Sequence, residues 1–191
     1  MKKQNKLNMV ALLIAAAILA LACGGANQQA EANKIVDEAN KKLEQTKDDY
    51  SKIEIRNSFL FSANIQTIQQ LRYYQSKMSD EAQSISKEYE RISTSLKDIG
   101  KQYDDISRLN VDEKYKEYAK LKSDEYVKRS EAVSVRKGNA QAFAEISDPR
   151  IMTSKFAENN EKSDKLFKDA EDIATKAKKI EEDNKEIFAK S

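Results

Sequence analysis

The 191-residue sequence has no histidine, no tryptophan, one cysteine, one proline and four glycines. Without histidine it cannot build a histidine-based catalytic triad, and histidine-ligated zinc sites are excluded as well. Di-iron bundle enzymes are also excluded, because they need Glu-x-x-His pairs on facing helices. With one cysteine, no disulfide can form within the chain. We therefore expect a protein that is not an enzyme and has no catalytic residues, no metal site and no cofactor.

The shortage of glycine and proline also indicates the fold class. Charged residues make up 35% of the sequence, and only Gly100, Gly138 and Pro149 interrupt the chain after Ala26. This composition is typical of long helices rather than of sheets, which need frequent turns. The sequence predicts an all-α protein, an elongated antiparallel bundle of about four helices with coiled-coil-like heptad stripes.

The N-terminal stretch has the composition of a secretory signal. Three lysines precede an apolar run from Met9 to Ala22, which is followed by Cys23. The run is too short to cross a hydrocarbon core of about 30 Å comfortably as a helix. Its end, Leu19-Ala20-Leu21-Ala22-Cys23-Gly24, resembles the lipobox of bacterial lipoproteins. This resemblance covers residues 1–24 and implies that Cys23 is lipidated, with palmitate as an expected acyl group, and becomes the first residue of the mature chain.

The resemblance also implies a domain organisation. Residues 1–22 form the signal peptide, 23–26 the lipidated cysteine and a short tether, and 27–191 the helical-bundle domain. The signal holds three of the 34 Lys and Arg and none of the 32 Asp and Glu, so residues 23–191 carry 31 minus 32, a formal net charge of −1. A nucleic-acid partner is not expected, because nothing indicates a basic face.

The expected location is a bacterial membrane, to which the chain is attached by its N-terminal lipid. Gly24, rather than aspartate, follows the cysteine. In lipoproteins of bacteria that have an outer membrane, this favours outer-membrane delivery, with the body in the periplasm or facing the surface. The three-residue tether would keep the bundle close to its bilayer.

Periodicity predicts the helix boundaries. The first helix begins after a cap at Asn27 and has apolar or neutral residues at alternating steps of four and three. A longer stripe of the same kind runs from Phe61 to Ile106 and predicts the second helix. The break between them falls at residues 56–58 or at residues 76–80. We favour 56–58, because the stripe passes through 76–80 without a change of phase.

Two further boundaries follow. A turn at residues 109–112, with Asn110 as cap, predicts a third helix that is weaker near Gly138-Asn139. Ser147-Asp148-Pro149 predicts the start of a fourth helix, with Asp148 as cap and proline in the first turn, which continues nearly to Ser191.

Polar residues and glycine within the apolar stripes have alternative interpretations. Asn64, Gln75 and Asn184 either fix the register of the helices or line a hydrated ligand site inside the bundle. Gly100 marks either a kink or a close helix crossing.

Most of the eight tyrosines are expected to pack in the core or at its edge. Tyr73 and Tyr74 are the exception, because adjacent helical residues cannot both face one core. With Phe59 they form a candidate contact surface, which we expect to be exposed, for an unknown protein partner or for self-association. The sequence thus suggests a membrane-anchored structural or protein-interaction module of the cell envelope. The alternative is a surface-exposed adhesin that binds a host or matrix molecule.

Overall fold

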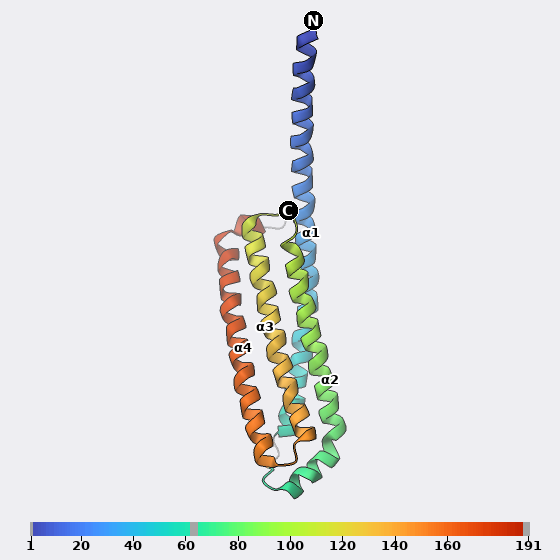
Figure 1. The fold of residues 1–191 in the computed structure, drawn as a ribbon, viewed down its shortest axis with the longest axis vertical. Helices are drawn as coiled ribbons and strands as arrows, with labels where there is room; N and C mark the ends of the chain where they lie inside the picture. The colour runs from blue at the N-terminus through green and yellow to red at the C-terminus, as the bar shows by residue number, and fades with distance from the viewer. Residues whose placement is uncertain (1, 62–64, 189–191) are drawn as a thin grey trace.

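The protein is described by a computed structural model that covers residues 2–61 and 65–188, with side chains described for 28–60 and 65–188. Every regular element in the described part is a helix (Figure 1). The helices are α1 (Lys2–Phe61), α2 (Ile68–Ile106), α3 (Glu113–Glu145), α4 (Pro149–Asp183) and the single turn α5 (Lys185–Phe188). The prediction of an all-α helical bundle is confirmed. The expectation that the first helix begins after a cap at Asn27 is wrong, because the backbone of α1 is helical through this residue.

Helices that follow one another in the chain pack side by side and run antiparallel (Figure 1). The connections α1–α2 and α3–α4 lie at one end of the bundle, which we call the distal end. The α2–α3 connection lies at the opposite, proximal end, where the backbone N–H of Asn110 donates to Oε1 of Gln28. Helices α1 and α4 are not neighbours in the chain and meet through long side chains, such as the rings of Tyr50 and Phe167.

The break between the first two helices lies after Phe61, so the favoured position at 56–58, which lies within α1, is wrong by a few residues. The alternative at 76–80 is wrong, because those residues lie within α2. The expectation that the second helix begins near Phe61 is also wrong. Helix α2 begins after Thr67, whose hydroxyl accepts from the backbone N–H of Gln70 at 3.2 Å, while Oε1 of Gln70 accepts from the N–H of Thr67 at 3.1 Å. This reciprocal capping box satisfies two free donors and determines where the helix starts.

Asp112, rather than Asn110, caps α3. Its Oδ1 accepts from the backbone N–H of Lys114 at 2.7 Å. A carboxylate is favoured at this position, because it also interacts with the positive end of the helix dipole. The predicted boundary before α4 is confirmed. Oδ1 of Asp148 accepts from the N–H of Arg150 at 2.8 Å, and Pro149 lies in the first turn.

Helix α3 continues through Gly138, where the sequence predicted a weak point. Gly138 leaves room for Asn159 of α4, because a Cβ atom at Gly138 would lie 3.0 Å from Nδ2 of Asn159. That amide donates to Oδ1 of Asn139 at 2.9 Å, so the polar pair joins α3 to α4. Helix α4 ends earlier than predicted, at Asp183. Asn184 follows it as the C-cap and donates to the carbonyl of Ile180 at 2.7 Å.

The apolar stripe of α2 lies in the core, as its spacing predicted. Its buried members are Leu71, Ala82, Ile85, Tyr89, Ile92, Leu96, Ile99, Tyr103 and Ile106. The prediction is wrong for Ile68, which is 49% exposed in the first turn of the helix. Gly100 marks a close helix crossing, since a Cβ atom there would lie 3.2 Å from the backbone carbonyl of Ser123 in α3. Nearby, the hydroxyls of Ser93 and Ser130 lie 2.9 Å apart, and each contacts the carbonyl of the other residue. These small residues let α2 and α3 approach closely.

The stripe assignment can be tested with two substitutions on α2. Leu96→Ala is expected to lower the free energy of unfolding by about 2–5 kcal/mol, because it leaves a cavity at a side chain that is 6% exposed. Lys87→Ala, at an exposed position of the same helix, is expected to change it by less than about 0.5 kcal/mol. Denaturant unfolding followed by circular dichroism measures both. Equal shifts would mean that the helix face has been assigned incorrectly.

Candidate functional site

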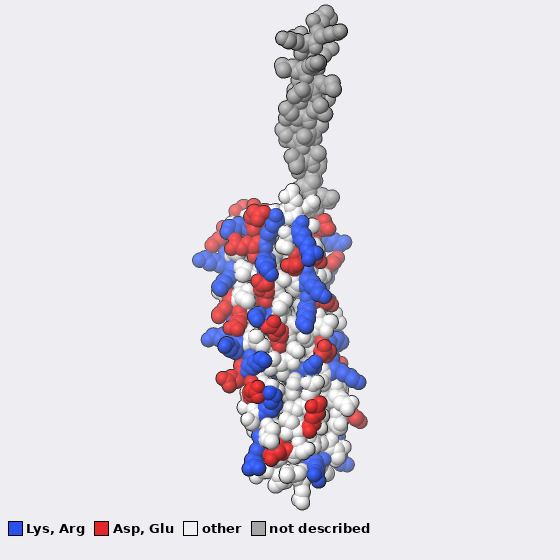
Figure 2. All heavy atoms as spheres, in the orientation of Figure 1, with Lys and Arg blue, Asp and Glu red and all other residues white. Residues whose placement is uncertain are grey.

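Large apolar side chains that remain exposed gather at the distal end of the bundle. Six are exposed in the described part of the chain, and all but Val127 lie near the α1–α2 or α3–α4 connection. We call these five the distal apolar residues: Ile55 and Phe59 of α1, Ile68 and Tyr73 of α2, and Ile151 of α4. On the face drawn in Figure 2, uncharged atoms predominate at this end, and charged side chains are densest toward the proximal end.

The three predicted contact residues lie on the helices on either side of the α1–α2 connection. They are not equally exposed. Phe59 is 68% exposed and Tyr73 is 60% exposed. Tyr74 is half-buried, packs against the core and contacts the ring of Tyr73 edge-on at 5.6 Å. The expectation that Tyr74 is exposed is therefore wrong, because this side of the first turns of α2 faces the core. Cys23, the predicted lipidation site, lies outside the residues whose side chains are described.

The sequence itself carries a signal for the distal end, in its distribution of charge. Residues 57–76 contain a single charged residue, Arg72, although about a third of the whole chain is charged. This stretch forms the end of α1, the connection and the first turns of α2. The loss of charge thus coincides with the end of the bundle at which Ile55, Ile68 and Ile151 are also exposed.

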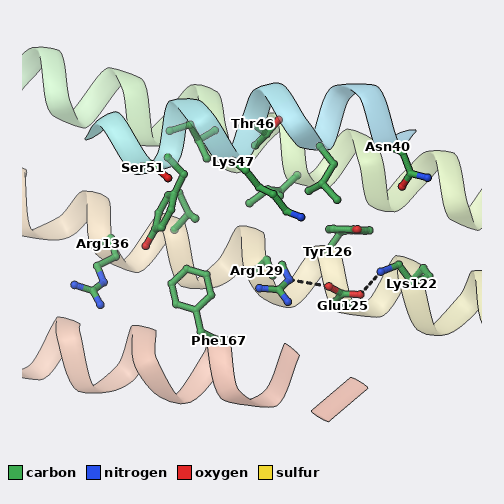
Figure 3. A pocket seen from close by; sticks show the side chains of 15 residues that line it. Asn40, Thr46, Lys47, Ser51, Lys122, Glu125, Tyr126, Arg129, Arg136 and Phe167 are labelled. Carbon is green, nitrogen blue, oxygen red and sulfur yellow. Dashed lines mark hydrogen bonds and ion pairs between the residues drawn. The ribbon is translucent and has the colours of Figure 1, made fainter. Parts of the chain in front are cut away.

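A second feature is a cavity of about 680 Å³ on the side of the bundle, which we call the lateral cavity. Side chains of all four long helices line it, and Figure 3 shows those of α1 and α3 facing one another across it, with Phe167 reaching in from α4. Apolar groups of Leu43, Tyr50, Ile92, Leu96, Val133 and Phe167 form much of its wall. The cavity lies where α1 and α4 are joined only by long side chains.

The charges in the lateral cavity are unequal. Lys47, Lys122, Arg129 and Arg136 line it, whereas Glu125 is its only acidic residue. Glu125 is 3% exposed, and it accepts from Nζ of Lys122 at 2.5 Å and from Nε of Arg129 at 2.8 Å. These partners compensate the burial of its charge. Because Glu125 lies at positions i+3 and i−4 relative to its partners on α3, the three side chains hold one another in place.

At the distal side of the cavity, Arg136 is held by partners outside it. Its guanidinium lies 2.6 Å from Asp164 and 3.9 Å from Glu54. Glu54 also accepts from the hydroxyl of Tyr89 at 2.6 Å. Burial, together with the negative charge of Glu54, raises the pKa of Tyr50 and of Tyr89 well above the usual range. Both phenols therefore stay neutral and act as hydrogen-bonding and packing groups.

The polar residues of the apolar stripes do not meet in one site. Nε2 of Gln75 donates to the backbone carbonyls of Phe143 at 2.6 Å and Ile146 at 2.9 Å, so it caps the C-terminal end of α3. Asn184 caps the end of α4, and Asn64 lies outside the described residues. Gln75 and Asn184 therefore act as helix caps, a role that neither alternative predicted.

Within the described residues, no group of three or more His, Cys, Asp and Glu side chains is arranged to hold a metal ion. None of the helices, over the residues whose side chains are described, is long and apolar enough to cross a membrane. No protein-family model matches the sequence, and comparisons with curated proteins and with solved structures gave no match either. The fold defines the class of the protein, an antiparallel all-α bundle, and its function has to be argued from its surfaces.

Proposed function

We propose that this protein is a lipid-anchored module of the bacterial cell envelope that contacts a partner protein through its distal apolar residues. The observation that carries the proposal is the position of these residues in the chain. The lipobox-like sequence precedes the part of α1 whose side chains are described, which begins at the proximal end, whereas Ile55, Phe59, Ile68, Tyr73 and Ile151 lie at the distal end. Residues 28–61 of α1 span about 50 Å at a rise of 1.5 Å per residue.

The chemistry of the distal end supports a protein contact. Exposed aromatic and branched side chains are costly in water, and their grouping commonly marks an interaction surface. Interface centres are depleted of charge and enriched in aromatic residues, as is the stretch 57–76 with Phe59 and Tyr73. The rest of the surface is rich in ion pairs between neighbouring turns, such as Lys120 with Asp124 and Lys155 with Glu158. Such pairs maintain solubility and contribute little specificity.

The proposed contact predicts a position-dependent crosslink. We expect a photoreactive residue in place of Tyr73, in the full chain in cells, to yield a partner adduct on illumination. The same residue in place of Lys168, an exposed position on α4, is the control and should yield none. Adducts from Lys168 alone would place the contact elsewhere, and adducts from neither position would contradict an interaction role.

The mass of the Tyr73 adduct separates the kinds of partner. An adduct of twice the chain mass would indicate self-association, and a heterologous adduct would indicate an envelope protein. Proteolysis of whole cells shows which side of the membrane the bundle faces. Cleavage of the bundle in intact cells, together with an adduct to a host or matrix molecule, would favour the adhesin alternative.

A further inference from the structure

We propose that the lateral cavity binds a small organic anion with an extended apolar body, and that a medium-chain carboxylate is the simplest such ligand. This site is separate from the distal apolar residues and does not depend on the proposed partner contact. The observations that lead to it are the size of the cavity, the excess of positive charge at one end, and the apolar wall between its charged groups.

Size and shape fit a small molecule. A volume of about 680 Å³ lies within the roughly 300–1,000 Å³ that is typical of ligand pockets. Along α1 the lining runs from Asn40 to Ser51, which corresponds to about 17 Å at 1.5 Å per residue. The cavity is therefore elongated along the bundle axis, and a linear ligand fits it better than a round one.

Only part of the positive charge near Glu125 is neutralised by partners within the protein. Lys47 is exposed, has no ion pair or hydrogen bond in the described part of the chain, and points into the cavity (Figure 3). Arg129 donates to Glu125 through Nε, which leaves its two terminal NH₂ groups without a protein partner in the described residues. Three cations and one carboxylate leave a net charge of +2 at this end of the cavity.

This arrangement favours an anionic headgroup over a neutral or cationic one. Arg129 presents parallel N–H donors that suit a carboxylate, and Lys47 supplies a second charge from the opposite wall. Glu125 restrains the cations of α3. Lys122, which pairs with Glu125, also lies 4.7 Å from the ring centroid of Tyr126. Because Lys122 and Arg129 are held by Glu125 before a ligand arrives, only Lys47 loses much conformational entropy when an anion binds.

The apolar wall of the cavity would contact the apolar body of the ligand. Leu43 of α1, Leu96 of α2 and the rings of Tyr50 and Phe167 belong to this wall. In Figure 3, Phe167 lies between Arg129 and Arg136, away from the end that holds Glu125 and Lys122. The two rings meet edge-on at 5.8 Å and bridge α1 to α4. Arg136 also lines the cavity, but it is paired with Asp164 and Glu54. It is therefore not free to bind a second anion. The cavity thus has one free anion site and one apolar arm.

Photoaffinity labelling of the full-length protein in membrane vesicles tests the site. The probe is dodecanoate with a photoreactive group near the end of its tail, and the controls are the same tail with an alcohol or an ammonium head. We expect the carboxylate probe to label peptides around residues 43–51 and 167 about tenfold more than either control, because a charge-assisted hydrogen bond gives about that factor. Equal labelling by all three probes, or labelling confined to the distal end, would overturn the proposal.

Variants of two lysines on one helix provide the matched comparison. Lys47→Gln should reduce carboxylate labelling about tenfold, and Lys41→Gln, an exposed lysine of α1 outside the cavity, should leave it unchanged. Leu43→Trp should block the apolar arm and abolish labelling by the carboxylate probe. Unchanged labelling in both Lys47→Gln and Leu43→Trp would overturn the assignment, provided that circular dichroism shows the native helix content.

Competition with unlabelled compounds distinguishes a free carboxylate from a membrane phospholipid as the ligand. Excess unlabelled dodecanoate should displace the probe, and a short-chain phosphatidylglycerol at the same concentration should not, because its two tails and glycerol head exceed the single apolar arm. Displacement by phosphatidylglycerol without displacement by dodecanoate would contradict the carboxylate assignment.

Discussion

Tyr103→Ala is expected to lower the free energy of unfolding by about 3–5 kcal/mol, the range for removal of a large buried aromatic side chain. Tyr103 is 1% exposed. Its ring stacks on Tyr126 with centroids 5.7 Å apart and meets Tyr118 edge-on at 6.3 Å. It therefore joins α2 to α3 through two aromatic contacts, and the cavity left by alanine cannot be filled without moving one of these helices.

Tyr103→Phe is the matched control. The Tyr103 hydroxyl lies 3.4 Å from Oδ1 of Asn40, which is long for a hydrogen bond. Its removal is expected to cost less than about 1 kcal/mol. Both variants can be measured by denaturant unfolding, with the midpoint and slope fitted together. A large loss in the phenylalanine variant would show that the hydroxyl, rather than the ring, holds this part of the core.

Cys23→Ala is expected to abolish both acylation of the protein and its cleavage after Ala22. The proposed function attaches the chain to the membrane through this lipid. Each buried methylene contributes about 0.8 kcal/mol, and stable anchoring needs two chains or one chain with a second signal. Without acylation, cleavage after Ala22 is not expected, so the variant should keep the longer, unprocessed chain.

Growth with a fatty-acid analogue, followed by fractionation and mass spectrometry, measures incorporation, location and processing together. Ala26→Ser, three residues beyond the cysteine, is the control and should be labelled like the wild type. If Cys23→Ala incorporates the analogue as well as the wild type does, the lipoprotein assignment is wrong. Loss of labelling with unchanged membrane retention would mean that another feature attaches the chain.

The sequence by itself determined the architecture, because helix stripes and caps depend on short-range spacing. The four-and-three steps from Ile85 to Ile106 identified the buried face of α2, and Asp148-Pro149 identified the start of α4. Where sequence reasoning failed, a more local signal was missed. The Thr67 and Gln70 capping box, for example, marks the start of α2, whereas the apolar stripe begins several residues earlier, at Phe61.

Only the tertiary structure decided which polar and charged side chains acquire a role. Lys122, Glu125 and Arg129 have the spacing of an ordinary solvated helix face. They form a partly buried charged cluster, in which Glu125 is buried, because α1 and α4 flank that face of α3. Gln75 became a cap for a helix that begins far along the chain. Lys47 comes to face Arg129 only through the antiparallel return of the chain. The physical reason is that burial, and with it the strength of each charge interaction, is set by neighbouring helices, whereas helical periodicity is set within one segment.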